Sequence, residues 1–191
     1  MARSSASRSA RGGAPGSYVA LLRGINVGGK NKLPMVELAA LFTEAGCSAV
    51  RTYIQSGNVV FGVAPGQAER LPELIARRIA ERFDIRVPVV LRSAEQIREV
   101  ARGNPFLEAG ADLDALHVAF LASKPAPGRV AELDPNRSPP DAFRVIGREV
   151  YLFLPGGVAR TKLTNGFFDS KLATISTVRN WRTVLKLLEM A

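Results

Sequence analysis

The sequence predicts an α+β fold of duplicated ferredoxin-like units, and two observations lead to that prediction. Along residues 18–92, apolar runs and helical periodicities follow the order strand, helix, strand, strand, helix, strand, which is the ferredoxin-like motif. Residues 93–191 repeat part of this order, as a strand-helix-strand-strand unit followed by a C-terminal helix. We therefore expect two related halves packed as one compact body, preceded by a disordered basic tail at residues 1–17.

Turn and helix-end residues divide the first half into its elements. Strands are predicted at 18–23, 50–54, 59–63 and 87–91, and helices at 34–45 and 71–83. Pro34 suits the first position of a helix and Gly46 its end. Pro88 favours an edge position or a strand start for the fourth strand.

The second half begins with a helix that a capping box, Ser93 and Gln96, starts. A strand follows at 116–122, and the Pro-rich stretch 124–140 reads as a loop with one helical turn around Val130. Gly147-Arg148 predicts a two-residue hairpin between strands at 143–146 and 150–154. After an irregular basic segment, we expect the closing helix to begin at about Thr177.

Composition restricts the classes of protein that fit. No apolar run approaches 18 residues, so no membrane-spanning helix and no membrane partner are expected. A single cysteine fits a reducing compartment, and we expect a cytoplasmic protein. The net charge of +9 is uneven: the tail carries +3, residues 18–62 carry +2, residues 63–157 are neutral and residues 158–191 carry +4. Clustered positive charge points to an anionic partner, such as a nucleic acid or a nucleotide.

Several chemistries are disfavoured by the residues present. His117 and Cys47 are the only histidine and cysteine, so a Cys/His zinc site is not available, and both are expected to be packing residues. No metal and no cofactor are predicted. Residues 24–30 fit the G-x-x-x-x-G-K pattern, but Asn31 replaces the Ser or Thr that holds Mg²⁺, and Pro34 starts the helix too late for a nucleotide triphosphatase.

The closing helix is expected to carry a basic stripe beside its apolar face. Arg179, Arg182 and Lys186 are spaced at i, i+3 and i+7, and no acid lies between Ser170 and Leu188. The stripe is either a solvated face or part of a surface that binds an anion.

Four stretches together resemble a known family. They are Leu22-Arg23-Gly24-Ile25-Asn26-Val27-Gly28-Gly29, Tyr53-Ile54-Gln55-Ser56-Gly57-Asn58-Val59-Val60-Phe61, Lys162-Leu163-Thr164-Asn165 and Thr177-Val178-Arg179-Asn180-Trp181-Arg182-Thr183. The chain resembles the bacterial family called domain of unknown function (DUF) 1697 over roughly Ser17 to Met190. The resemblance implies a duplicated ferredoxin-like fold in a cytoplasmic bacterial protein, and it implies no activity. Thr161 stands where a Ser before the Lys is usual.

The leading hypothesis is an anion site, with phosphate-bearing ligands favoured, built by the 24–31 loop, the 55–58 turn and the 160–182 segment. Its candidate ligand-binding residues are polar, basic or glycine: Arg23, Asn26, Gly28, Gly29, Lys30, Asn31, Gln55, Ser56, Asn58, Lys162, Arg179 and Asn180. Two alternatives remain open: an enzyme acting by positioning and electrostatics without His, Cys or metal, and a structural or protein-interaction module without a small ligand. No catalytic residue and no oligomeric state are predicted.

Overall fold

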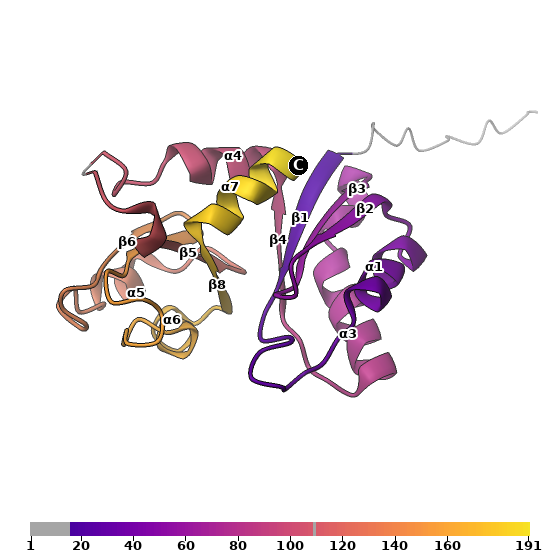
Figure 1. The fold of residues 1–191 in the computed structure, drawn as a ribbon, viewed down its shortest axis with the longest axis horizontal. Helices are drawn as coiled ribbons and strands as arrows, with labels where there is room; N and C mark the ends of the chain where they lie inside the picture. The colour runs from indigo at the N-terminus through magenta and orange to yellow at the C-terminus, as the bar shows by residue number, and fades with distance from the viewer. Residues whose placement is uncertain (1–15, 109) are drawn as a thin grey trace, which may run out of the picture.

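The computed structural model describes residues 16–108 and 110–191, which form two four-stranded antiparallel sheets with helices between and outside them (Figure 1). The predicted tail, residues 1–17, lies outside the described residues as far as residue 15, whereas Gly16 and Ser17 already belong to the first strand. None of the helices in the described residues has the length and apolar character needed to cross a bilayer.

The first sheet has the strand order β2-β3-β1-β4 and is covered on its outer face by α1 and α3 (Figure 1). The elements of this half are β1 (Gly16–Leu22), α1 (Met35–Glu44), β2 (Ser48–Tyr53), β3 (Asn58–Val63), α2 (Pro65–Ala68), α3 (Leu71–Phe83) and β4 (Val89–Ser93). The predicted order of strands and helices is observed, with a short α2 added. The last strand lies two residues later than predicted, so Pro88 precedes it, and β4 is an edge strand as Pro88 suggested.

The second sheet has the order β6-β7-β5-β8. The elements of this half are α4 (Ala94–Arg102), the 3₁₀ turn η1 (Leu113–Ala115), β5 (Leu116–Leu121), α5 (Pro127–Ala131), β6 (Ala142–Ile146), β7 (Glu149–Phe153), α6 (Asn165–Leu172), β8 (Ser176–Asn180) and α7 (Trp181–Met190). The predicted capping box, the helical turn near Val130 and the Gly147 hairpin are all observed. Counted within each half, both sheets have the same order: second, third, first and fourth strand.

Two predictions at the C-terminal end were wrong. Residues 176–180 form strand β8 and not the start of the closing helix, because β5 pairs on one side with β7 and on the other with β8. The Asn180 side chain accepts a hydrogen bond from Thr183 N–H, so the helix starts only at Trp181. The segment expected to be irregular contains α6, whose start Thr164 caps. Helix α6 was not predicted because it contains residues of low helix propensity, Asn165 and Gly166 among them.

Apolar side chains form three layers that follow from this arrangement. One layer lies between the first sheet and α1 and α3, and another lies between the second sheet and α6. The central layer contains strand residues of both sheets together with α4 and α7, which lie next to each other at the top of Figure 1. Its largest side chain is Trp181, which is 1% exposed. The two halves therefore share one core, and α7 closes it.

The capping box at α4 gives a direct test of this part of the fold. Ser93→Ala removes the acceptor for Gln96 N–H and is expected to lower the free energy of unfolding by about 1 kcal/mol. Ser170→Ala, an exposed change inside α6, is the matched control and should leave stability equal or slightly raised. Urea unfolding of both variants measures the difference; equal stabilities would contradict the cap.

Candidate functional site

Two buried arginines, one from each half, cross to the opposite half. Arg92 lies in β4 and Arg179 in β8, and their exposed fractions are 1% and 7%. Arg92 stands opposite Val19 of β1, and Arg179 stands opposite Val118 of β5. The two arginines thus occupy the same position in the fourth strand of each sheet.

The Arg179 guanidinium joins the second sheet to the first. Its Nη2 donates to the carbonyl oxygens of Leu22 (2.6 Å), Ser56 (3.1 Å) and Gly57 (3.3 Å), and its Nε donates to Asn58 Oδ1 at 2.6 Å. Its Nη1 donates within β8, to the Thr177 hydroxyl and the Val178 carbonyl, both at 2.8 Å. Every N–H of this side chain therefore has a protein acceptor.

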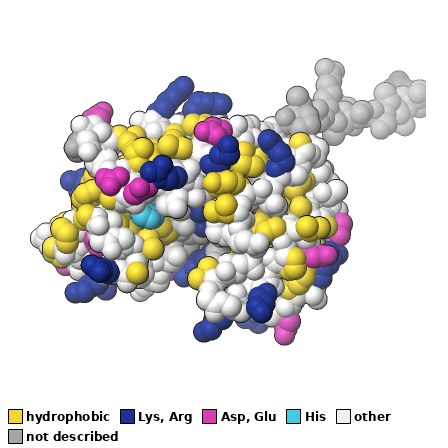
Figure 2. Space-filling model, in the orientation of Figure 1, with side chains coloured by type: hydrophobic (Ala, Val, Ile, Leu, Met, Phe, Trp, Pro, Cys, Tyr) yellow, Lys and Arg dark blue, Asp and Glu magenta, His cyan; other side chains and the backbone are white. Residues whose placement is uncertain are grey.

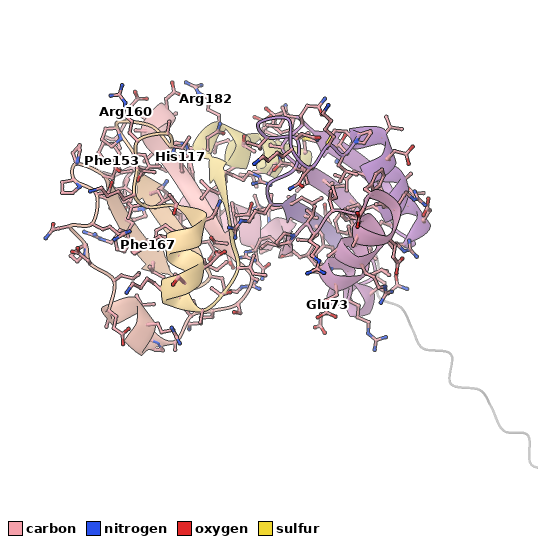
Figure 3. The ribbon with its side chains drawn as sticks, turned by 90° about the horizontal axis from the view of Figure 1, so that it is seen from below. Glu73, His117, Phe153, Arg160, Phe167 and Arg182 are labelled. Atoms are coloured by element: carbon pink, nitrogen blue, oxygen red, sulfur yellow. The ribbon has the colours of Figure 1, made fainter. Side chains whose placement is uncertain are left out.

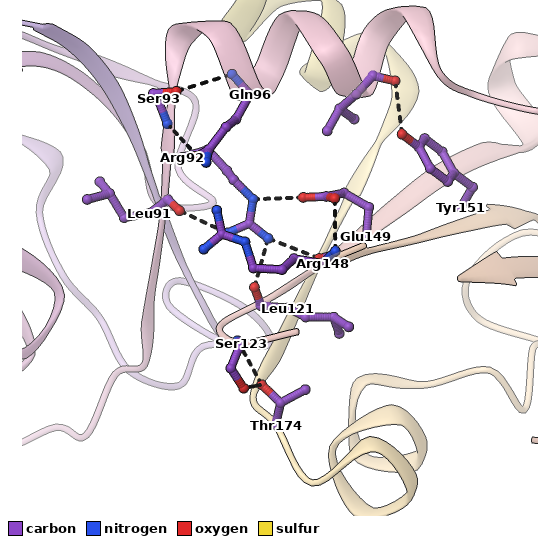
Figure 4. A network of polar contacts seen from close by, with 11 residues as sticks. Leu91, Arg92, Ser93, Gln96, Leu121, Ser123, Arg148, Glu149, Tyr151 and Thr174 are labelled. Atoms are coloured by element: carbon purple, nitrogen blue, oxygen red, sulfur yellow. Dashed lines mark hydrogen bonds and ion pairs between the residues drawn. The ribbon is translucent and has the colours of Figure 1, made fainter. Parts of the chain in front are cut away.

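The Arg92 guanidinium makes the corresponding contacts in the opposite direction (Figure 4). Its Nη2 donates to the carbonyls of Leu121 at 2.7 Å and Arg148 at 3.0 Å, and its Nη1 donates to the carbonyl of Leu91, which precedes it. Its Nε donates to Glu149 Oε1 at 2.8 Å. In both halves the acceptors are the end of the first strand, the hairpin between the second and third strands, and the first residue of the third strand.

The acceptor of the Nε–H group differs between the two contacts, and this difference changes the charge. Glu149 gives Arg92 a carboxylate partner, whereas the corresponding residue beside Arg179 is the neutral amide Asn58, which is fully buried. Burial lowers the pKa of Arg92, and the nearby Glu149 carboxylate opposes that lowering. At Arg179, burial alone lowers the pKa to about 10. Arg92 and Glu149 form a neutral pair, and Arg179 is a buried cation held by neutral acceptors.

The loop 24–31 is a small hairpin fixed by its two asparagines. Asn26 donates through Nδ2 to the carbonyls of Leu33 (2.9 Å) and Gln55 (3.0 Å), and its Oδ1 accepts from Leu33 N–H. Asn31 Nδ2 donates to the Gly24 carbonyl at 2.9 Å. The amides predicted to contact a ligand thus bind the backbone, and they hold the loop in one shape.

The tip of this hairpin is the exposed part of the loop. Lys30 N–H donates to the Val27 carbonyl at 3.1 Å, which closes a turn over Gly28 and Gly29. Both glycines have φ values in the left-handed region, +58° and +75°, as a tight hairpin turn requires. Among the described residues, the N–H groups of Gly28 and Gly29 and the Lys30 ammonium have no protein acceptor. These three exposed groups are the polar groups at the tip that can accept a ligand without breaking a hydrogen bond of the described residues.

The turn that precedes β3 connects the loop to Arg179. Asn58 Nδ2 donates to the Tyr53 carbonyl and to the Ser56 hydroxyl, at 3.1 Å and 3.0 Å. Gly57 is required here, because a Cβ on it would lie 2.7 Å from Leu22 Cβ, and its φ is +78°. Gln55 is exposed and takes part through its carbonyl, which accepts from Asn26. The loop, the turn and β8 therefore meet, as the sequence hypothesis required.

Arg23 adds a second connection between the halves, at the base of the same loop. Its guanidinium is paired with the Asp169 carboxylate of α6 and donates to the Ser176 carbonyl at 3.3 Å. The other Asp169 oxygen accepts from the backbone N–H of Ser176 at 2.8 Å and from its hydroxyl at 2.7 Å. Arg23 is thus neutralised by Asp169, whereas Lys30, and Lys32 just after the loop, have no ion-pair partner among the described residues.

The predicted basic stripe on the closing helix does not exist. Arg179 belongs to β8, Arg182 pairs with Asp114, and Lys186 pairs with Glu189. Arg182 and Arg160 both lie over the half formed by the second sheet (Figure 3). Sequence reasoning missed Asp114 because it is 68 residues from Arg182 along the chain, and it missed Glu189 because that acid follows directly after the interval Ser170 to Leu188.

The last two predicted site residues, Asn180 and Lys162, make no hydrogen bond or ion pair with the 24–31 loop among the described residues. Asn180 caps α7 through its side chain, so its role in the described residues is structural. The exposed Lys162 donates its backbone N–H to the Ser138 hydroxyl at 3.0 Å, and no hydrogen bond or ion pair joins it to the 24–31 loop among the described residues. The structure therefore does not bring Lys162 into contact with the other candidates.

Cys47 is buried, as expected of a packing residue, and His117, which we expected to be half-buried in its strand, is buried as well. Burial lowers the pKa of His117, whose Nδ1 lies 3.3 Å from the Ala115 carbonyl, and burial raises the pKa of the Cys47 thiol to about 11. Within the described residues, no group of three or more His, Cys, Asp or Glu side chains could hold a metal ion. The polar side chains at the junction between the two sheets are arginines together with their amide and carboxylate partners.

Two cavities lie beside Arg92 and share Gln96 and Arg148 in their walls. One measures about 360 Å³ and also contains Glu99 and Tyr151, and the other measures about 560 Å³ and also contains Tyr18. Acidic residues line both, so they do not offer a uniformly positive site. The exposed hairpin tip remains the stronger candidate for binding an anion.

Sequence reasoning did not find Arg92, Glu149 or Asp169. A signal for the first was present, because Arg92 and Arg179 each stand directly before the residue that caps the next helix, Ser93 or Asn180. An alignment of the two halves on these capping residues would have shown that Arg92 and Arg179 occupy corresponding positions. The ion pair between Arg23 and Asp169 has no such signal, since its partners are 146 residues apart.

The fold and this junction define an α+β protein of two antiparallel sheets, each fastened to the other by an arginine of its fourth strand. The chain matches the family described as "Protein of unknown function (DUF1697)" over residues 16–151, and it belongs to that family. The conserved bacterial protein SP0830 from Streptococcus pneumoniae has a similar structure, with a TM-score of 0.70 and 25% sequence identity over 93% of this chain and 99% of that one. No curated protein matches the sequence.

An arginine-to-lysine pair tests the role of Arg179. Arg179→Lys keeps the charge but removes donors needed by carbonyls of both halves, and it should lower the free energy of unfolding by about 3 kcal/mol. The exposed Arg182→Lys is the control and should leave stability unchanged within error. Equal urea midpoints for the two variants would show that the Arg179 contacts do not stabilise the fold.

Proposed function

We propose that this protein binds phosphate-bearing polymers, nucleic acids in particular, through the exposed tip of the 24–31 hairpin. The observation that carries the proposal is the pair of backbone N–H groups at Gly28 and Gly29 beside Lys30, none of which has an acceptor within the part of the chain that the structure describes. Consecutive backbone N–H groups next to a cation suit a phosphate oxygen. The ligand contacts are then Gly28, Gly29 and Lys30, while Asn26, Asn31 and Asn58 hold them in place.

Charge around the loop supports an anionic ligand. From the first residue to Val36 the sequence contains no acid, and Lys32 is a second exposed cation two residues from the tip. Lysine and arginine side chains lie at the lower edge of the right-hand half in Figure 2, the region where Figure 1 places this loop. A projecting basic tip suits a long anion that lies across it better than a nucleotide that needs an enclosing pocket.

Exposed apolar side chains on the same segments support a macromolecular ligand. Val27 at the tip is 64% exposed, Ile54 beside the Gln55 turn is 51% exposed, and Val36 after the loop is 81% exposed. Such side chains contact the sugars and bases of a bound strand, while lysines contact its phosphates.

We interpret the two halves as duplicated ferredoxin-like units. Their identical strand order, the βαββαβ succession in each, and the matching arginines of their fourth strands support this interpretation. A cytoplasmic location, where nucleic acids are accessible, remains part of the proposal.

Fluorescence anisotropy with a fluorescein-labelled single-stranded DNA, measured at salt concentrations from about 50 to about 200 mM, tests the proposal. Wild-type protein should bind at low salt, with affinity that falls steeply as salt rises. Lys30→Ala should weaken binding and reduce the slope of log K against log salt by about 0.7, the value for one phosphate contact on a single strand.

Lys124→Ala is the matched control, because Lys124 is an exposed lysine in a loop of the second half. It removes the same charge and should leave both affinity and slope near those of the wild type. If the wild-type protein does not bind the DNA at about 50 mM salt, the proposal is wrong, and a structural or protein-interaction module becomes the better explanation of the fold. Equal losses in the two variants would mean that only net charge matters.

A further inference from the structure

The two arginine contacts use acceptors at corresponding places, but only Arg92 has a carboxylate among them, and this difference has an electrostatic consequence. A buried cation without a counterion projects its field outward, since the surrounding protein screens it less than water does. Arg92 has Glu149 as an internal counterion, and Arg179 has only carbonyls, a hydroxyl and the Asn58 amide. Arg92 therefore has an internal counterion, with the Arg148 cation as a further neighbour, whereas Arg179 has no carboxylate among its hydrogen-bond partners.

The charged side is the one that carries the hairpin. Arg179 contacts the Leu22 carbonyl, directly before the loop, and the Ser56 and Gly57 carbonyls, in the turn that holds Asn26. Arg23 at the loop base is already paired with Asp169, so it does not cancel the charge of Arg179. Of the charges around this base, the positive charge of Arg179 is the one left over.

We propose that Arg179 is a positioning residue whose uncompensated charge strengthens anion binding at the hairpin, and that Asn58 in place of an acid is what leaves it uncompensated. The bound phosphate then serves as the external counterion that Glu149 supplies internally on the Arg92 side. This inference rests on the proposed function, because it concerns the affinity of the same loop. Arg179 does not contact the ligand, since all its donors are engaged within the protein.

A purely structural role for Arg179 makes a different prediction. If the side chain only fastens the two halves, then an acid beside it stabilises the junction and leaves ligand binding unchanged apart from net charge. If its charge reaches the ligand, then the same acid weakens binding while every residue at the tip stays in place. The two roles are separated by adding a carboxylate and leaving Arg179 intact.

Asn58→Asp adds the carboxylate next to the Arg179 guanidinium, at the place where Asn58 Oδ1 now accepts from Nε. Gln67→Glu is the control, since it adds the same charge at an exposed position of α2, beyond the opposite end of β3. Labelled single-stranded DNA should bind Asn58→Asp about fivefold more weakly than it binds Gln67→Glu. Equal affinities for the two variants overturn the inference.

The buried position calls for a second variant, because Asn58 also donates to the Tyr53 carbonyl. Ser56→Asp, on the half-buried turn, keeps a partner for Asn58 Nδ2 and brings a carboxylate into the same cluster. It should weaken binding by a similar factor relative to Gln67→Glu, which has the same net charge, with circular dichroism used to verify that both are folded. If neither acid weakens binding while wild-type protein binds, the inference fails alone; if wild-type protein does not bind, the proposed function fails.

Discussion

The structure depends on two reciprocal arginine contacts that join its halves. Arg92 and Arg179 each leave the fourth strand of one sheet and bind the carbonyls at the end of the first strand and at the hairpin of the other. A guanidinium suits this task because its five donors form a rigid planar fork, which can satisfy acceptors from several segments at once. The shared core around α4 and α7 supplies the apolar burial, and the arginines fix how the sheets meet around it.

The same contacts prepare the candidate site. The turn at Gly57 is held by Arg179 and in turn holds Asn26, so the hairpin is connected to the centre of the molecule through hydrogen bonds to backbone atoms. Amides and glycines that looked like ligand contacts in the sequence are used to shape the loop. At the tip, among the described residues, the N–H groups of Gly28 and Gly29 and the Lys30 ammonium have no protein partner, and the segment contains no acid. These groups at the tip, together with the charge of Arg179, support the binding of an anion.

The first half and most of the second were predictable, because hydrophobic periodicity and turn residues act locally. The helix 71–83 and the strands around Gly147 are such cases. Strand β8 was not predictable in this way, since Thr177 and Val178 fit both a helix and a strand, and pairing with β5 decides between them. At the site, the meeting of loop, turn and C-terminal segment was anticipated. The burial of Arg179 and the pairing of Arg23 with Asp169 were not, because both depend on contacts across more than a hundred residues.

Arg92 and Arg179 are held across the junction by these hydrogen bonds, and hydrogen exchange of arginine side chains measures this directly. In an NMR experiment on the ¹⁵N-labelled protein, the Nε–H protons of Arg92 and Arg179 should exchange with water far more slowly than those of exposed arginines such as Arg182. The reason is that burial and the bonds to Glu149 and Asn58 protect them. Nε–H protons that all exchange at the rate of exposed arginines would contradict the account.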